Sequence, residues 1–325
     1  MKAVLYSRYG APEVLELKEI PKPRPKDNEV LIKVRATTVT AADHRARACD
    51  TPKGFGLFAP LVFGVGKPRN PILGGELAGE IESVGAAVKQ FKVGDQVFAF
   101  SGAGFGCYVE YKCLPEDGTL ALKPPNLSHE QAAALSFGGT TALGLLKKAN
   151  IRKGHKVLVN GASGGVGTAT VQLARYFEAE VTGVCSTGNL QLVKAIGADH
   201  VIDYTIDDFT RNGERYDIIV DTAGTAPFSR CRDSLKDDGR LVIVLGTLAD
   251  LLQAPWVSMM GTKKVIATVV SWNAADLRFL ANLAESGKFM PVIDRRYPLE
   301  RITEAHRHVD TGRKKGNVVI TVSAA

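Results

Sequence analysis

The sequence predicts a two-part α/β protein, in which a β-rich part precedes a regular alternation of strands and helices. Three observations carry this prediction: short apolar runs up to about residue 125, an alternation of strand and helix patterns from Leu127 onward, and a glycine-rich turn after a strand. The chain has 325 residues. A typical domain has roughly 100–200 residues, so two domains are expected.

The first part holds several short apolar runs, separated by clusters of glycine and proline. Many short strands with such turn signals are typical of a compact barrel or sandwich. The runs expected to form strands are Met1–Tyr6, Val14–Ile20, Val30–Val34, Leu77–Val84, Gln96–Phe100 and Tyr108–Leu114.

From Leu127 onward, β-branched runs alternate with helical patterns. Ser128 is expected to cap a first helix, because Gln131 follows three residues later. Strand–helix alternation predicts a parallel sheet with helices on both faces, and six strands match a doubly wound dinucleotide fold. The expected strands are Val157–Val159, Val181–Val184, Val201–Asp203, Ile218–Asp221, Leu241–Leu245 and Val265–Val270. The expected helices include Val166–Phe177 and Leu190–Ile196, then Ala275–Gly287 and Leu299–Val309 before a last strand, Asn317–Val322.

Composition excludes several classes of protein. With 45% hydrophobic and 23% charged residues, the chain is an ordinary globular protein. Its net charge of +7 is spread along the sequence, and basic clusters such as 313–315 lack interleaved aromatics. We therefore expect no nucleic-acid partner.

No targeting or membrane-spanning segment is expected. The most apolar stretch, residues 54–66, is about half the ~20 residues that a membrane helix needs, and Pro60 interrupts it. The five cysteines form no Cys-x-x-Cys pair, which fits free thiols in a reducing compartment. A cytoplasmic location is the expectation.

The strongest local signal is the strand Lys156–Val159 followed by Asn160–Gly167. Gly161 permits a tight turn, Gly164 lets backbone amides approach a pyrophosphate, and Gly167 lets the following helix pack on its strand. The helix N-terminus adds unpaired N–H groups and a positive dipole end. Within the strand alternation, this turn predicts a dinucleotide-binding site.

The residues after the second strand of this part bear on cofactor preference. A site for NAD usually has Asp or Glu there to accept from the ribose 2′-hydroxyl. Here no carboxylate occurs before Asp199, whereas the hydroxyls of Ser186 and Thr187 can donate to a 2′-phosphate. The loop has no Lys or Arg. NADPH is therefore favoured, and NADH remains possible.

At this point the sequence resembles the medium-chain dehydrogenase/reductase superfamily, and within it the zinc-free quinone oxidoreductase group. The resemblance covers nearly the whole chain and is most specific at Gly74–Gly85, Val93–Val97 and Asn160–Gly167. It implies a GroES-like β-rich catalytic domain over residues 1–125 and 290–325, with a Rossmann nucleotide-binding domain over 126–289. It also implies a homodimer or another homo-oligomer.

The resemblance argues against zinc. Zinc-dependent relatives carry His where this chain has Gly75 and Cys where it has Thr40, and residues 137–139 offer no third ligand. Hydroxyl and glycine cannot replace imidazole and thiolate on tetrahedral zinc. Without a Lewis acid, quinones and α,β-unsaturated carbonyls are the favoured hydride acceptors, because their charge spreads onto an oxygen that hydrogen bonds can stabilise.

Thr40 and Arg45 are the catalytic candidates, since they stand where quinone reductases have Asn and an aromatic residue. They are expected to donate to a substrate oxygen or the nicotinamide ribose. Arg45 could instead pair with an acidic neighbour. His44 could deliver a proton or simply be exposed, and Asp43 is expected to hold loop backbone.

The resemblance and the glycine turn together give a set of cofactor-binding candidates. They lie at the turn, at strand ends and at the start of a helix. They are Thr141, Ser163, Gly164, Gly165, Val166, Ser186, Thr187, Asn189, Tyr204, Leu245, Gly246, Ser271 and Asn317.

Three interpretations of function stay open. The first is an NADPH-dependent reductase of a small-molecule quinone or enone. The others are an alcohol dehydrogenase-type enzyme and a non-catalytic NADPH-binding protein. The apolar stretch 54–66 follows the helix expected at the active site, and it could line a pocket, a subunit interface or a membrane contact.

Overall fold

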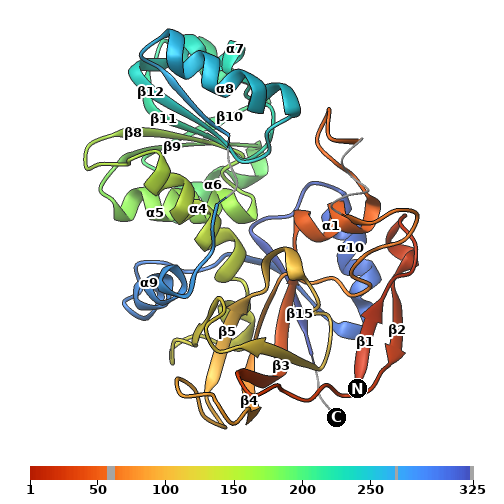
Figure 1. Ribbon diagram of the computed structural model, residues 1–325. Helices are drawn as coiled ribbons and strands as arrows, with labels where there is room; N and C mark the ends of the chain where they lie inside the picture. The colour runs from red at the N-terminus through yellow and green to blue at the C-terminus, as the bar shows by residue number, and fades with distance from the viewer. Residues whose placement is uncertain (57–62, 268–269, 323–325) are drawn as a thin grey trace. The chain divides into compact units, whose positions relative to one another are not determined.

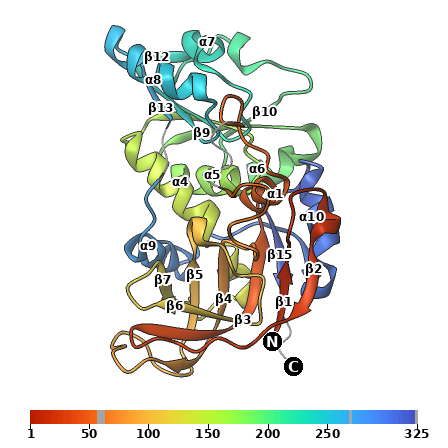
Figure 2. The same ribbon diagram turned by 45° about the vertical axis from the view of Figure 1, so that its right-hand side comes forward.

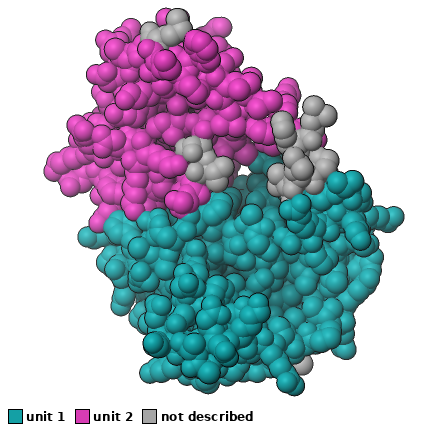
Figure 3. Space-filling view, in the orientation of Figure 1, with its two compact units in different colours: residues 1–51, 57–140, 272–325 teal, residues 52–56, 141–271 magenta. Residues whose placement is uncertain are grey.

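The computed structural model describes residues 1–56, 63–267 and 270–322, and the chain divides into two compact units (Figure 3). Unit 1 comprises Met1–Thr51, Leu57–Thr140 and Trp272–Ala325, and unit 2 comprises Pro52–Gly56 and Thr141–Ser271. These limits differ from the expected domain boundaries. The helix His129–Ala133 packs on the strands Glu29–Val39 and Glu76–Val84, and the helix Ala274–Glu285 packs on the strand Leu120–Leu122, all in unit 1. The domain boundaries themselves stay a prediction.

Unit 1 is built on a seven-stranded sheet that joins both ends of the chain (Figures 1 and 2). The strand order is β14-β15-β3-β4-β5-β7, and β6 also pairs with β3. The C-terminal strand β15 runs antiparallel to β3, with Val319 opposite Thr38. The strands are β3 (Glu29–Val39), β4 (Glu76–Val84), β5 (Gln96–Phe100), β6 (Tyr111–Pro115), β7 (Leu120–Leu122), β14 (Ile293–Pro298) and β15 (Asn317–Thr321). A separate antiparallel pair is β1 (Lys2–Leu5) and β2 (Glu16–Glu19).

The core of unit 1 lies between this sheet and its helices. Alternating residues of β3 and β4, such as Val30, Ile32, Leu77 and Ile81, are fully buried. The helices are α1 (Ala41–Ala48), α3 (His129–Ala133), α9 (Ala274–Glu285) and α10 (Ile302–Asp310), and α4 (Ser136–Lys148) begins here and continues into unit 2. Ser128 and Gln131 form the expected capping box at α3.

Unit 2 has the expected six-stranded parallel sheet, in the order β10-β9-β8-β11-β12-β13. Helix α5 lies on one face and α8 on the other (Figures 1 and 2). The strands are β8 (Lys156–Asn160), β9 (Glu180–Cys185), β10 (His200–Asp203), β11 (Tyr216–Asp221), β12 (Leu235–Ile243) and β13 (Lys264–Ala267). The helices are α5 (Gly165–Tyr176), α6 (Leu190–Ala195), α7 (Phe228–Cys231) and α8 (Leu248–Met260). The strand order reverses at β8, so the glycine turn lies at the switch point of a doubly wound sheet.

Three elements differ from the sequence-based expectation. Strand β12 begins at Leu235, earlier than expected, because Leu235 pairs with Tyr216 of β11 before the register shifts and Arg240 pairs with Ile218. Helix α8 was not expected; a capping box of Thr247 and Asp250 starts it, and it tolerates Pro255 inside. Strand β7 was also not expected.

The cysteines, the apolar helices and the apolar stretch 54–66 were also subjects of the sequence analysis. All five cysteines are free, as expected. No helix in the described part of the chain is long and apolar enough to cross a bilayer. Within the apolar stretch 54–66, residues 57–62 lie outside the described residues; Gly54 lies against Leu248 in unit 2.

Candidate active site

The start of helix α1 holds the first candidate residue, Thr40, in a capping role. The Thr40 hydroxyl accepts from the amide of Asp43, and it donates to Asp43 Oδ2 over 2.6 Å. The Thr40 amide donates to the same carboxylate over 2.8 Å. The proton of the Thr40 hydroxyl is therefore engaged within the cap.

Asp43 ties this cap to the neighbouring strand. Its Oδ1 accepts from the amide of Gly74 over 2.8 Å, just before β4. The side chain is fully buried, and burial raises the pKa of Asp43 while the bonds from Thr40 and Gly74 oppose the shift. The expectation that Asp43 holds loop backbone is confirmed.

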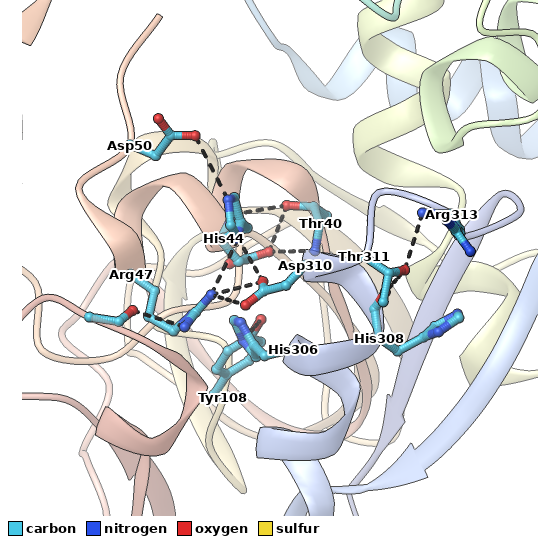
Figure 4. A network of polar contacts seen from close by, with 12 residues as sticks. Thr40, His44, Arg47, Asp50, Tyr108, His306, His308, Asp310, Thr311 and Arg313 are labelled. Atoms are coloured by element: carbon cyan, nitrogen blue, oxygen red, sulfur yellow. Dashed lines mark hydrogen bonds and ion pairs between the residues drawn. The ribbon is translucent and has the colours of Figure 1, made fainter.

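The two arginines of α1 have different surroundings. Arg47 is buried, and its Nη2 donates to both carboxylate oxygens of Asp310 on α10, over 2.8 and 2.6 Å. His44 joins them, with Nδ1 2.6 Å from Asp310 Oδ1 (Figure 4). The half-buried guanidinium of Arg45 makes no hydrogen bond or ion pair with the described residues, and burial lowers the pKa of Arg45. The ion pair considered for Arg45 is therefore not formed among the described residues, and it is Arg47 that pairs with an acid, Asp310.

Glu76, at the first position of β4, is a buried carboxylate in the same unit. It accepts from the Thr38 hydroxyl and from the amide of Phe137 over 2.5 Å. Burial raises the pKa of Glu76 to about 7, and the positive charge of Lys314 opposes that shift. Glu76 is therefore poised between its two protonation states near neutral pH.

The glycine-rich turn of unit 2 has the geometry that the sequence predicts. Gly161 has φ of +82°, and a Cβ on Gly167 would lie 2.1 Å from the Gly161 carbonyl oxygen, so only glycine lets α5 approach β8. Gly164 stands at the N-cap of α5 with no side-chain cap, and a Cβ there would make only an ordinary contact of 3.6 Å with the Gly161 carbonyl oxygen. The first amides of α5, from Gly165 onward, have no preceding helical carbonyl to bond.

Asn189 connects this turn to the end of β9. Its Nδ2 donates to Ser163 Oγ over 3.2 Å and to Ser186 Oγ over 3.1 Å. Its Oδ1 is buried and has no partner among the described residues. A buried acceptor without a donor is rare in folded proteins, so this atom fits a hydroxyl of a bound ligand.

Thr187 lies beside a carboxylate that the sequence places far away. Strand β10 pairs with β9 so that Asp203 stands opposite Cys185. Asp203 Oδ1 accepts from the hydroxyl and amide of Thr205, and Thr205 Oγ1 lies 3.2 Å from Thr187 Oγ1. The end of β9 therefore has a nearby carboxylate, Asp203, which lies beyond the loop that follows β9 in the sequence.

The other predicted cofactor residues have varied surroundings. The Thr141 hydroxyl in α4 is buried without a partner in the described part of the chain, whereas Tyr204 is exposed. Leu245 and Gly246 lie in the loop between β12 and α8, and Ser271 is exposed. Asn317 belongs to unit 1, and its Nδ2 donates to the Val292 carbonyl over 3.1 Å.

Hydrogen bonds between the ends of β8 and β11 hold the glycine turn in place. Asn160 Nδ2 donates to Asp221 Oδ1 over 2.9 Å, and the Thr222 hydroxyl donates to the Asn160 carbonyl over 2.9 Å. Asp221 Oδ2 also accepts from the amide of Ala226. These polar residues come together because the ends of adjacent parallel strands meet at one sheet edge.

Unit 2 fits a nicotinamide dinucleotide on its own geometry. It offers a glycine turn with no side chain at the N-cap Gly164, uncapped amides at α5, and buried oxygens on Asn189 and Thr141 that have no partner among the described residues. A pyrophosphate suits such a helix N-terminus, and ribose hydroxyls suit the unfilled side-chain oxygens.

Comparison with known proteins agrees with this geometry. The alcohol dehydrogenase GroES-like domain family matches residues 26–125, and the zinc-binding dehydrogenase family matches residues 196–320. The chain is 33% identical to the chloroplast envelope quinone oxidoreductase homolog of Arabidopsis thaliana, over 98% of each chain. The chain belongs to the medium-chain dehydrogenase/reductase superfamily, in its quinone oxidoreductase group.

Further members of the superfamily extend the similarity. The chain is 33% identical to the quinone oxidoreductase of Homo sapiens, over 96% of this chain and 94% of the relative. It is 32% identical to the NADPH-dependent alkenal/one oxidoreductase, chloroplastic, of Arabidopsis thaliana, over 98% and 79%. The structure of the quinone oxidoreductase from Coxiella burnetii matches with a TM-score of 0.89 and 29% identity, covering 99% of both chains.

One matching family is named for binding zinc, but this chain lacks suitable ligand side chains at the positions of the zinc-dependent relatives. The Thr40 hydroxyl bonds Asp43, and Gly75 has no side chain. Among residues 1–56, 63–267 and 270–322, no group of three His, Cys, Asp or Glu side chains could hold a metal ion. The donor set does not fit tetrahedral zinc, which prefers imidazole, thiolate or carboxylate ligands.

Proposed function

We propose that this member of the superfamily is a zinc-independent oxidoreductase that transfers a hydride from NADPH to a small-molecule quinone or α,β-unsaturated carbonyl. The observation that carries the proposal is the dinucleotide site of unit 2, with glycine at the N-cap of α5, uncapped amides, and buried oxygens on Asn189 and Thr141 without partners among the described residues. The names of the relatives, which include quinone oxidoreductases and an NADPH-dependent alkenal/one oxidoreductase, support the same substrate class.

Each part of the turn has a role toward the dinucleotide. The amides at the start of α5 bind the pyrophosphate, and Gly164 lets it approach the backbone. Ser163, Ser186 and Asn189 form one hydrogen-bonded group that orients the adenosine ribose. Bound in this way, the reduced nicotinamide supplies the hydride.

Unit 1 supplies a cation for the substrate oxygen. The Arg45 guanidinium has no carboxylate partner among the described residues and is half-buried, so its charge is available to an oxygen that becomes negative during reduction. Thr40 acts as a positioning residue, because its proton is engaged by Asp43 and its cap holds the start of α1.

Cofactor choice and assembly belong to the same proposal. The hydroxyls of Ser186 and Thr187 favour the 2′-phosphate of NADPH, whereas the nearby Asp203 lowers that preference, so NADH is also used. We also propose a cytoplasmic homodimer. The free cysteines support the location, and the resemblance to the quinone oxidoreductase group supports self-association.

A turnover screen tests the proposal. The purified protein is mixed with NADPH or NADH and a series of quinones, enals and enones, with and without added zinc or a chelator. Steady oxidation of NADPH with quinones or enones, unchanged by zinc or chelator, is the expected result. Alcohol oxidation that requires zinc would identify an alcohol dehydrogenase. Tight NADPH binding without turnover on any acceptor would identify a non-catalytic binding protein.

A further inference from the structure

Three aromatic side chains from distant parts of the sequence meet inside unit 1. The Phe100 ring, at the end of β5, lies 5.0 Å from the Trp272 ring at an interplanar angle of 78°. The Phe137 ring, in the first turn of α4, lies 5.8 Å from the Phe100 ring at 43°. Edge-on and tilted contacts of this kind are favourable between aromatic rings, and they build an apolar surface.

The indole nitrogen of Trp272 is the exceptional atom of this cluster. It is buried, and it makes no hydrogen bond to any residue that the structure describes. A buried indole N–H usually has an acceptor, and leaving a polar group unpaired costs about 1–3 kcal/mol. The unpaired donor therefore points to an acceptor that comes from outside the chain.

Two glycines give the rings their room. Gly102 has φ of +56°, and a Cβ there would lie 3.4 Å from the Trp272 ring. A Cβ on Gly75 would lie 3.4 Å from the Phe100 ring. Gly75 directly precedes the buried Glu76, whose carboxylate accepts from the amide of Phe137. The cluster thus adjoins the buried carboxylate of Glu76.

We propose that Trp272 donates a hydrogen bond from Nε1 to the carbonyl oxygen of a planar, conjugated substrate that stacks in the aromatic cluster. This inference rests on the proposed function and narrows its substrate class to quinones and aryl enones, in preference to small aliphatic enals. Flat rings match the apolar surface of Phe100 and Phe137, and the carbonyl oxygen supplies the missing acceptor for the indole.

The chemical step balances without a proton from the indole. The hydride forms a new C–H bond at the β-carbon of an enone, and the C=C electron pair moves so that the carbonyl oxygen becomes an enolate oxygen. The Trp272 N–H stabilises that negative charge while keeping its proton, because an indole is a very weak acid. Water supplies the proton that completes the reduction. In a quinone, the corresponding product is the hydroquinone monoanion, which water likewise protonates.

The two tryptophans of the chain allow a direct test. Trp256 is 68% exposed on α8, so Trp256→Phe leaves Trp272 as the only indole, and Trp272→Phe leaves Trp256. Each variant, loaded with NADP⁺ so that no turnover occurs, is titrated with 1,4-naphthoquinone while tryptophan emission is recorded. We expect saturable quenching in Trp256→Phe and only weak, linear collisional quenching in Trp272→Phe. Equal quenching curves in the two variants would overturn the inference.

Steady-state kinetics gives the second readout. Trp272→Phe keeps an aromatic ring but removes the donor, so kcat/KM for naphthoquinone should fall about tenfold, as expected for one lost hydrogen bond. Its KM for NADPH and its circular dichroism spectrum should match those of Trp256→Phe. Unchanged kcat/KM in Trp272→Phe overturns the inference even if the enzyme reduces quinones.

The same titration separates the two proposals. Saturable quenching of Trp272 without any NADPH oxidation supports the quinone site and contradicts the proposed reductase activity. NADPH oxidation by quinones without saturable quenching of Trp272 supports the reductase activity and contradicts the quinone site.

Discussion

Arg47 on α1 and Asp310 on α10 form an ion pair in which the arginine is buried and the aspartate side chain is 24% exposed. Nη2 of the arginine contacts both carboxylate oxygens at 2.8 and 2.6 Å. Arg47 Nη1 also donates to the Gly10 carbonyl over 2.9 Å. The pair fixes α1, with Thr40 at its cap and Arg45 on its second turn, against the C-terminal helix of the unit. A segment near the end of the chain therefore positions candidate residues near its beginning.

Removing the carboxylate of this pair should destabilise the protein. Asp310→Asn keeps the size of the side chain but leaves the Arg47 cation buried without a counter-ion. We expect a loss of about 3 kcal/mol in the free energy of unfolding, measured by urea denaturation. Glu82→Gln is the matched control, since it breaks the exposed Lys22–Glu82 pair and should cost less than about 1 kcal/mol. Equal losses in the two variants would contradict the role of Asp310 as the counter-ion of the buried Arg47.

Glu76 should make stability depend on pH in a defined window. Burial raises the pKa of Glu76 from 4.5 to about 7, so within this range the folded protein keeps a proton that the unfolded chain releases. The contribution of Glu76 to stability is therefore fully present below the unfolded pKa and is lost as pH rises toward the folded pKa.

Glu76→Gln mimics the protonated carboxyl and isolates this effect. Its free energy of unfolding, relative to the native chain, should improve by up to about 3 kcal/mol between about pH 5 and about pH 8. Urea denaturation of both proteins at each pH measures the difference. A pH-independent difference would mean that Glu76 stays ionised in the fold.

Arg45 and Thr40 should differ in how their loss affects catalysis. Arg45→Ala removes the unpaired guanidinium and should lower kcat/KM for quinones at least tenfold, with unfolding free energy nearly unchanged. Thr40→Ala removes the cap of α1 and should cost about 1 kcal/mol of stability. Thr40→Ser keeps the hydroxyl and should restore the stability that Thr40→Ala loses. Values of kcat/KM within about twofold of the native enzyme for Arg45→Ala and Thr40→Ala would refute the catalytic assignment.

Two glycines of the same turn should give opposite results on alanine substitution. Gly164 has an ordinary backbone conformation, and a Cβ there would make only an ordinary 3.6 Å contact with the Gly161 carbonyl oxygen. Gly164→Ala should therefore fold normally but weaken NADPH binding about tenfold, because its methyl group meets the pyrophosphate. In Gly167→Ala the new Cβ would meet the Gly161 carbonyl oxygen, and the fold itself should lose stability. Isothermal titration with NADPH and thermal unfolding distinguish the two. Full NADPH affinity in Gly164→Ala would place the pyrophosphate elsewhere.

The sequence alone determined the architecture of the chain and the place of its dinucleotide turn. Strand–helix alternation and the spacing of Gly161, Gly164 and Gly167 are local patterns, because strand periodicity and tight turns depend on neighbouring residues. The family resemblance added the catalytic candidates Thr40 and Arg45. The same local rules missed α8, because Pro255 interrupts its helical pattern.

Only the tertiary structure decided which polar groups are paired. It joined Arg47 to Asp310, left Arg45 without an ion pair among the described residues, and brought Asp203 to the end of β9. It also buried Glu76, which accepts from Thr38 and Phe137, and left the indole nitrogen of Trp272 without a partner in the described part of the chain. These relations depend on strand register and helix packing between residues far apart in the chain. Local sequence patterns carry no information about such long-range pairing.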